Sequence, residues 1–268
     1  MFKKVNGITI NYEVKGQGEE TIIFVHGLGG SLNIWNSQVN ICSRYFKTIT
    51  YDLRGSGRSE VSTNEYSIEL WVEDLKALLD SENVGQAHLV GWSLGTLIVQ
   101  HFAITHPEMV LSQSLVGPLW EIPETGKTNL YKRADLVEQE GMDAVADTII
   151  DGGVSPYSKH GQTALVGLIR ELLQRNDKRA YAATCKALAD GKAINHQDVQ
   201  APTLLIVGDG DNTAPVPVAT RLLNHFPNAK LEVISNSGHW TTVEKPQEVN
   251  QLLLRFLQTA NQSQTVRV

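Results

Sequence analysis

The chain has 268 residues, 41% of them hydrophobic, with two cysteines and a formal net charge of −6. Its size suits one large domain or a core with a small insertion, and its hydrophobic content excludes global disorder. The negative charge argues against nucleic acid or an anionic membrane as the main partner, and two cysteines outside any metal-ligand spacing exclude a disulfide framework.

The amino-terminal residues point to a cytoplasmic protein. Residues 1–7 lead directly into a polar, strand-like segment, without an apolar signal region. No apolar run is long enough to span a bilayer, so we expect no membrane partner. Cys42 and Cys185 are then expected to be reduced thiols.

Two strands are predicted within the first 25 residues of the chain. Residues 8–14 alternate apolar and polar side chains, which is typical of a half-buried strand. Thr21–Val25 is a continuous apolar run, as expected for a central strand buried on both faces. It ends in the glycine-rich loop His26–Ser31, and ligands bind at this end of open parallel sheets.

A further strand and a helix follow. Residues 47–51 predict a strand, closed by the turn 52–59, in which we expect Asp52 and Arg54 to be structural. Residues 68–83 predict a helix with one apolar face, formed by Trp71, Leu75, Leu78 and Leu79.

The segment Gly91-Trp92-Ser93-Leu94-Gly95 fits the G-x-S-x-G pattern of a nucleophile elbow. A short apolar run, 87–90, precedes it, and a helix-compatible run, 96–103, follows it before Pro107. Strand, sharp turn and helix is the context in which a serine is held in a strained conformation, exposed above the sheet. Ser93 is therefore a candidate nucleophile.

The hydrophobic pattern changes in the middle of the chain. After a predicted strand at 110–116, strand-like runs are replaced by helical periodicity from Leu119 to about Gln197. We predict a core formed by residues 1–118 and 198–268, with a helical insertion over 119–197. One amphipathic stripe in the insertion contains Leu165, Leu168, Ile169, Leu172 and Leu173.

Strand patterns return in the last quarter. Residues 202–207 predict a buried strand that ends in Gly208-Asp209-Gly210-Asp211, and residues 230–234 predict the last strand. Pro246 opens a final helix with the apolar face Val249, Leu252, Leu253, Phe256 and Leu257. Alternating strands and helices predict an α/β fold, with a mostly parallel sheet covered on both faces.

A serine nucleophile needs a base and a group that orients the base. Among eight histidines, His239 lies in a loop just after the last predicted strand, downstream of the serine and of a loop with carboxylates. Asp209 and Asp211 are both candidates for the orienting acid. His26 lies in the glycine-rich loop already described. The remaining histidines are assigned to a strand (His88), to helices or their neighbourhood (His101, His106 and His225) and to the surface of the insertion (His160 and His196).

The order Ser93, Asp211, His239 is that of the α/β-hydrolases, and the whole chain resembles an α/β-hydrolase with a helical cap. The motifs are His26-Gly27, Asp52-x-x-Gly55-x-Gly57-x-Ser59, the elbow, Gly208-x-x-Asp211-x-x-x-Pro215 and Gly238-His239. The resemblance implies that Asp211 is the acid. It also implies that the backbone N–H groups of Leu28 and Leu94 form the oxyanion hole.

A closer resemblance is to the 3-oxoadipate enol-lactonases, carried by residues 133–142, Ser155-Pro156 and 181–188. It implies that Arg133 pairs with a substrate carboxylate. Trp92 and Trp120 are further candidates for substrate binding. The chain departs from these enzymes at Thr96, where they usually carry glycine, and in the stretch 119–123.

The sequence therefore predicts a hydrolase that needs neither cofactor nor metal and cleaves a small ester or lactone through an acyl-enzyme. Perhydrolase (haloperoxidase-like) and carbon–carbon bond hydrolase chemistry use the same three residues and stay open. A small-molecule receptor with very slow turnover is the alternative from another class.

Overall fold

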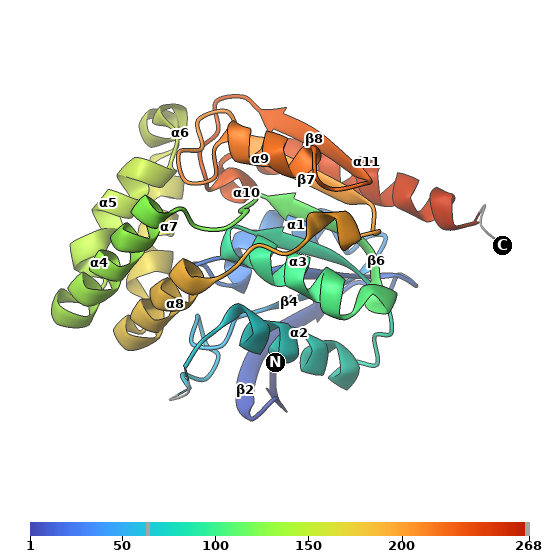
Figure 1. Ribbon diagram of the computed structural model, residues 1–268, viewed down its shortest axis with the longest axis horizontal. Helices are drawn as coiled ribbons and strands as arrows, with labels where there is room; N and C mark the ends of the chain where they lie inside the picture. The colour runs from blue at the N-terminus through green and yellow to red at the C-terminus, as the bar shows by residue number, and fades with distance from the viewer. Residues whose placement is uncertain (63–64, 266–268) are drawn as a thin grey trace.

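The computed structural model describes residues 1–62 and 65–265, and an eight-stranded sheet forms its centre (Figure 1). The strands are β1 (Phe2–Val5), β2 (Ile8–Lys15), β3 (Thr21–Val25), β4 (Lys47–Tyr51), β5 (Ala87–Trp92), β6 (Val110–Val116), β7 (Thr203–Gly208) and β8 (Ala229–Ile234). Their order across the sheet is β1-β2-β4-β3-β5-β6-β7-β8. β2 pairs antiparallel with β1 and β4, and all the other neighbouring pairs are parallel.

The strands β2 to β8 form where the sequence pattern predicts them, within one or two residues, whereas β1 was not predicted. Every residue of β3, β5, β6 and β7 is buried, because helices cover both faces of a mostly parallel sheet. The edge strand β8 has one buried residue, Ile234. The fully buried middle of the sheet is the platform on which the loops at the carboxyl ends of β3, β5 and β7 are carried.

Among the described residues, six α-helices belong to the core. They are α1 (Asn36–Cys42), α2 (Ile68–Ser81), α3 (Leu94–Thr105), α9 (Val216–Leu223), α10 (Thr241–Glu244) and α11 (Pro246–Thr265). α1 packs against α11, and α2 packs against α3. The predicted apolar face of α2 is buried, but the helix ends at Ser81 rather than Asn83, because Asn83 adopts a left-handed conformation. α1, α9 and α10 were not predicted from the sequence.

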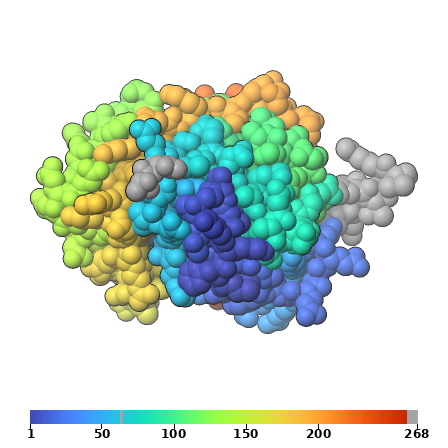
Figure 2. Space-filling view, turned by 90° about the horizontal axis from the view of Figure 1, so that it is seen from below, coloured from blue at the N-terminus to red at the C-terminus, as the bar shows by residue number. Residues whose placement is uncertain are grey.

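Five helices lie between β6 and β7, on the left in Figure 1. They are α4 (Glu124–Glu140), α5 (Asp143–Gly153), α6 (Pro156–Gly161), α7 (Thr163–Gln174) and α8 (Lys178–Asp190). Seen from below, this group, coloured from yellow-green to yellow, lies at one end of the molecule (Figure 2). The predicted stripe on α7 is buried at Ile169, Leu172 and Leu173, whereas Leu168 is 45% exposed because it lies on the outer edge of the stripe.

None of the helices within 1–62 and 65–265 combines the length and the apolar character needed to cross a membrane. In the same part of the chain, no group of at least three histidine, cysteine, aspartate or glutamate side chains is arranged to hold a metal ion.

Candidate active site

Ser93 occupies a strained turn between β5 and α3. Its backbone angles are φ 54° and ψ −121°, a combination that L-residues adopt rarely. Added side chains would clash at both flanking glycines: a Cβ at Gly91 would lie 2.5 Å from the Gly95 carbonyl oxygen, and one at Gly95 would lie 2.2 Å from that of Val25. The Ser93 N–H donates to the Val116 carbonyl at 3.0 Å, which ties the turn to β6.

Three residues from distant parts of the chain meet at this turn. His239 Nε2 lies 2.8 Å from Ser93 Oγ, and His239 Nδ1 lies 2.8 Å from Asp211 Oδ2. Because the carboxylate can only accept, Nδ1 carries the proton and Nε2 presents a lone pair to the serine hydroxyl. A serine held in this way can lose its proton as it attacks an electrophilic carbon.

Asp211 is held in place by the backbone that follows it. Its Oδ1 accepts from the N–H groups of Thr213 and Ala214, each at 2.8 Å, and its side chain is buried. Asp209 is exposed and accepts instead from the Ser237 N–H at 3.3 Å. The geometry therefore brings Asp211, and not Asp209, to the histidine.

The loop that carries His239 is tied down on several sides. The Trp92 indole Nε1 donates to the His239 carbonyl at 2.8 Å, and the His239 N–H donates to the Gly153 carbonyl at 2.7 Å. The buried carboxylate of Glu244 accepts from the N–H groups of Gly238 and Ser155, each at 3.0 Å. Gly153 and Ser155 belong to the segment between β6 and β7, so this segment helps to position the histidine.

The loop after β3 lies directly against the serine. A Cβ on Gly27 would lie 2.7 Å from the Ser93 Cβ, so glycine is required for this approach. His26 accepts from the Leu53 N–H at Nε2 (3.0 Å) and donates from Nδ1 to the Gly27 carbonyl (2.8 Å). Burial lowers the pKa of His26, which keeps the imidazole neutral in this bridging role.

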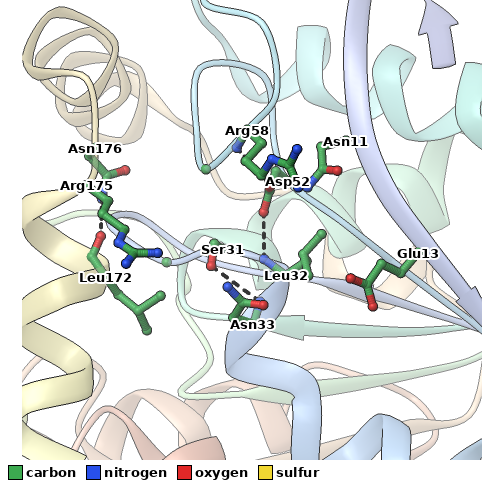
Figure 3. Close-up of a pocket in the computed structure, with 12 residues that line it drawn as sticks. Asn11, Glu13, Ser31, Leu32, Asn33, Asp52, Arg58, Leu172, Arg175 and Asn176 are labelled. Atoms are coloured by element: carbon green, nitrogen blue, oxygen red, sulfur yellow. Dashed lines mark hydrogen bonds between the residues drawn. The ribbon is translucent and has the colours of Figure 1, made fainter. Parts of the chain in front are cut away.

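Asp52 holds the far side of the same loop. Its Oδ1 accepts from the Leu32 N–H at 2.8 Å, in a second cavity of about 310 Å³ that is also lined by Ser31 and Arg175 (Figure 3). Arg54 forms a buried ion pair with Asp74 at 2.6 Å. Both residues thus have the structural contacts expected from the sequence.

The main cavity, of about 430 Å³, opens above the serine. Ser93, His239, Trp92 and Leu28 line it from the core, and the helices between β6 and β7 contribute residues that include Arg133, Ile149, Tyr181 and Leu188. Burial raises the pKa of Tyr181, which leaves a neutral phenol beside the Arg133 guanidinium. Most of the wall is apolar, with one cation from Arg133.

Two residues lie elsewhere than the sequence suggested. Trp120, predicted to bind substrate, is not among the described residues that line this cavity; its ring stacks on His196 with centroids 4.1 Å apart, beneath the Arg221 guanidinium. His196, predicted at the surface, is buried and hydrogen-bonded to Gln100 at 2.9 Å. These contacts join residues far apart in sequence, so periodicity carries no signal for them.

Sequence reasoning missed Tyr181 and Glu244 as site residues. Tyr181 belongs to the stretch that resembles the enol-lactonase cap, which is a usable signal for a cavity residue. Glu244 lies on the short helix α10 and is buried, and nothing in its sequence neighbourhood indicates that its carboxylate would accept two backbone N–H groups.

Comparisons with known proteins give consistent findings. A family described as "alpha/beta hydrolase fold" matches residues 20–181, and one described as "TAP-like protein" matches residues 175–267. The chain is 30% identical over 246 residues to 3-oxoadipate enol-lactonase 2 of Acinetobacter baylyi, covering 91% of each chain.

The chain is also similar in sequence to a second hydrolase and in fold to a solved enol-lactonase structure. The chain is 29% identical to the 2-hydroxy-6-oxononadienedioate/2-hydroxy-6-oxononatrienedioate hydrolase of Paraburkholderia phymatum, covering 93% of this chain and 91% of that one. Its fold superimposes on the crystal structure of the enol-lactonase from Burkholderia xenovorans LB400 with a TM-score of 0.92, at 24% identity, covering 96% of this chain and 100% of that one.

Proposed function

Because the chain belongs to the alpha/beta hydrolase fold family, we propose that it is a serine hydrolase that cleaves a small ester or lactone through an acyl-enzyme. The observation that carries this proposal is the pair of 2.8 Å hydrogen bonds that join Ser93, His239 and Asp211 at the base of the cavity. A serine is activated when an adjacent base takes its proton and a third group orients that base.

In the first step Ser93 Oγ attacks the substrate carbonyl carbon, and its proton passes to His239 Nε2. Asp211 stabilises the imidazolium that forms. The two backbone N–H groups that donate to its Oδ1 hold the carboxylate in its orientation towards His239. The tetrahedral intermediate collapses when His239 returns the proton to the leaving oxygen, which gives an acyl-Ser93. Water then attacks this ester, with His239 again as base.

In the tetrahedral intermediate the former carbonyl oxygen of the substrate carries a negative charge, which hydrogen-bond donors must stabilise. The backbone N–H groups of Leu28 and Leu94 are the candidates. Leu94 is the first residue of α3, so its N–H has no carbonyl from a preceding helical turn. Leu28 lines the cavity and follows the loop glycine that touches Ser93. We assign both N–H groups to the oxyanion hole, where each is worth roughly 10²–10³ in rate.

The substrate is proposed to be small and to carry a carboxylate. The cavity of about 430 Å³ suits a small molecule, and Arg133 supplies a cation to its wall. A guanidinium pairs well with a planar carboxylate. The relatives named above act on 3-oxoadipate enol-lactone and on a nonadienedioate, whose names both describe acidic molecules.

We further propose that residues 119–197 form a cap domain over this cavity. Cavity residues such as Arg133 on α4, Ile149 on α5 and Tyr181 on α8 all come from this segment. A roof of this kind excludes water, which strengthens the interactions with the oxyanion. Substrate choice would then depend on the cap, while the chemistry depends on the core.

A second candidate, carbon–carbon bond hydrolysis, is supported by the 29% identity to the nonadienedioate hydrolase. It would use the same serine, histidine and aspartate. The two functions differ in the bond that the substrate presents to Ser93.

A substrate panel on the purified protein tests the proposal. It contains small acidic lactones, neutral lactones of equal size, p-nitrophenyl esters of short acids, and a dienoate that presents a carbon–carbon bond, each run beside Ser93→Ala. We expect hydrolysis of acidic lactones and short esters that the variant lacks. Cleavage of the dienoate only would favour the second candidate, and no turnover of any substrate would contradict both.

A further inference from the structure

Thr96 is buried in the first turn of α3 and holds the carbonyl group of Ser93. Its backbone N–H donates to the Ser93 oxygen at 2.8 Å, and its hydroxyl Oγ1 donates to the same oxygen at 2.6 Å. The Ser93 carbonyl therefore has two donors from a single residue, although it belongs to a strained turn.

The Ser93 carbonyl and the Leu94 N–H belong to one peptide unit. This unit is planar and trans, so its N–H points away from its C=O. Whatever fixes the direction of the carbonyl consequently fixes the direction of the N–H, which is the oxyanion donor assigned above. A donor on the oxygen also polarises the unit and makes its N–H a stronger donor.

The Thr96 hydroxyl has a second partner, the first peptide of the segment that leaves the core. Oγ1 accepts from the Leu119 N–H at 3.1 Å. The same hydroxyl thus connects Leu119 to the Ser93–Leu94 peptide. Since Leu119 is buried, its N–H would lose this acceptor if residue 96 lacked a hydroxyl.

The other end of the segment is attached to the same helix. Gln100 Nε2 donates to the carbonyl oxygens of Thr96 (2.9 Å) and Leu119 (3.0 Å), and Gln100 Oε1 accepts from His196 Nε2 at 2.9 Å. Both connections of residues 119–197 to the core therefore meet on the first two turns of α3. The nucleophile and the cap share one buried hydrogen-bond network.

We propose that Thr96 is a positioning residue of the oxyanion hole. Its hydroxyl fixes the orientation of the Ser93–Leu94 peptide, and hence of the Leu94 N–H, and connects this peptide to Leu119, where the proposed cap begins. The inference rests on the proposed serine-hydrolase function. It gives a physical role to a residue at which this chain departs from the glycine that the enol-lactonases usually carry. In this chain the hydroxyl donates to the Ser93 carbonyl and accepts from the Leu119 N–H, and a glycine at this position can make neither hydrogen bond.

The test uses three substitutions in the full-length protein. Thr96→Val removes the hydroxyl at nearly constant volume, and Thr96→Ser retains it. Thr184→Val is the matched control, because buried Thr184 also donates from Oγ1 to a backbone carbonyl, that of Ala180 at 2.8 Å, but in α8. Each variant is assayed with a p-nitrophenyl ester and with its thionoester, in which sulfur replaces the carbonyl oxygen and accepts hydrogen bonds poorly.

We expect Thr96→Val to lower kcat for the ester by about 10- to 100-fold, less than complete loss of an oxyanion donor, with KM nearly unchanged. The ratio of ester to thionoester rates should fall by a similar factor, because the thionoester depends less on these donors. Thr96→Ser should restore both values, and Thr184→Val should alter neither.

Two results would overturn the inference: an unchanged kcat in Thr96→Val, or a fall in kcat with the ester-to-thionoester ratio preserved. Should Thr96→Val fail to fold, Thr96→Ala removes the same hydroxyl with less bulk and is judged by the same ratio. If the parent hydrolyses neither esters nor lactones, the proposed function fails separately. The inference is then judged from crystal structures of parent and variant, in which an unmoved Ser93–Leu94 peptide contradicts it.

Discussion

The loops that hold Ser93, Asp211 and His239 and the helices α4–α8 above them are built differently. The three side chains are buried, and each has at least one hydrogen-bond partner within the core. In α4, by contrast, the buried residues are Leu130, Ala134 and Val137, and in α7 they are Ile169, Leu172 and Leu173. The helices α4 and α7 thus rest on narrow apolar stripes, whereas the three side chains at the serine are enclosed.

The charges of the two regions differ in the same way. The core buries the ion pair between Arg54 and Asp74, which links the turn after β4 to α2. The helices above the site carry exposed pairs such as Lys186 with Glu138, which contribute little to stability. A change on the exposed faces of α4 or α7 therefore perturbs fewer buried contacts than one in the loops. We accordingly expect changes in the loops to affect the chemistry, and changes in the wall of the cavity to affect the choice of substrate.

The largest effect is expected in the catalytic loops. Ser93→Ala removes the nucleophile and should lower kcat on the order of 10⁶-fold, as in other enzymes that lose a triad nucleophile. Steady-state kinetics measure the loss, and circular dichroism checks that the variant folds. Hydrolysis within about tenfold of the parent by a folded variant would contradict the role of Ser93.

The next effect distinguishes two neighbouring carboxylates. Asp211→Asn should lower kcat by roughly 10⁴-fold, because an amide favours the wrong imidazole tautomer. Asp209→Asn is the matched control, since Asp209 is exposed and contacts the Ser237 N–H rather than the histidine. The reverse ranking of the two variants would show that the acid has been misassigned.

A smaller effect, confined to binding, is expected in α4. Arg133→Ala should raise KM for an acidic lactone by an amount that corresponds to about 1.5–3 kcal/mol, because a hydrogen bond to a charged group is lost. KM for a neutral ester of similar size should stay near the parent value. Lys132→Ala, which changes the exposed neighbouring cation, is the control. Equal effects on both substrates, or on neither, would leave Arg133 without this role.

The last prediction concerns the pH dependence of stability rather than catalysis. It involves His196, at the junction of the core and the segment 119–197. Burial, with smaller effects from His225, Arg221 and His101, lowers the pKa of His196 from 6.5 to about 4. Between pH 6.5 and pH 4, residue 196 is therefore protonated in the unfolded chain but neutral in the folded chain. Because the unfolded chain binds the extra proton, the free energy of unfolding decreases as the pH is lowered through this range.

His196→Gln keeps a donor for Gln100 but removes this proton. Its melting temperature should consequently fall by a few degrees less than that of the parent between pH 6.5 and pH 4. Differential scanning calorimetry of the two proteins gives the comparison. Parallel profiles would contradict a buried, neutral His196.

The central strands β3 and β7 could be predicted from the sequence because each is a short apolar run. Both are buried throughout, so their pattern needed no tertiary information. The short helices α1 and α9 were missed, because each spans about two turns, which is too short for a helical period to be recognised in the sequence. Their stability comes from packing rather than from local sequence.

The meeting of Ser93, Asp211 and His239 could be predicted because motif spacing reflects the demands of the backbone, as the crowding at Gly91 and Gly95 illustrates. Trp120 and Thr96 could not be interpreted in this way. The stack of Trp120 on His196 and the hydrogen bond of Leu119 to Thr96 join positions that are adjacent only in the folded chain. Nothing local distinguishes such a residue from a substrate contact or from a chance departure.

Covalent labelling tests the central claim, that Ser93 is the activated nucleophile, most directly. The protein is treated with a fluorophosphonate, digested and analysed by mass spectrometry, with Ser93→Ala and His239→Ala run in parallel. The account predicts one adduct, on the peptide that contains Ser93, formed with loss of all hydrolytic activity. It also predicts no adduct in Ser93→Ala and slow labelling in His239→Ala. An adduct on another residue, or full activity after Ser93 is labelled, would contradict the account.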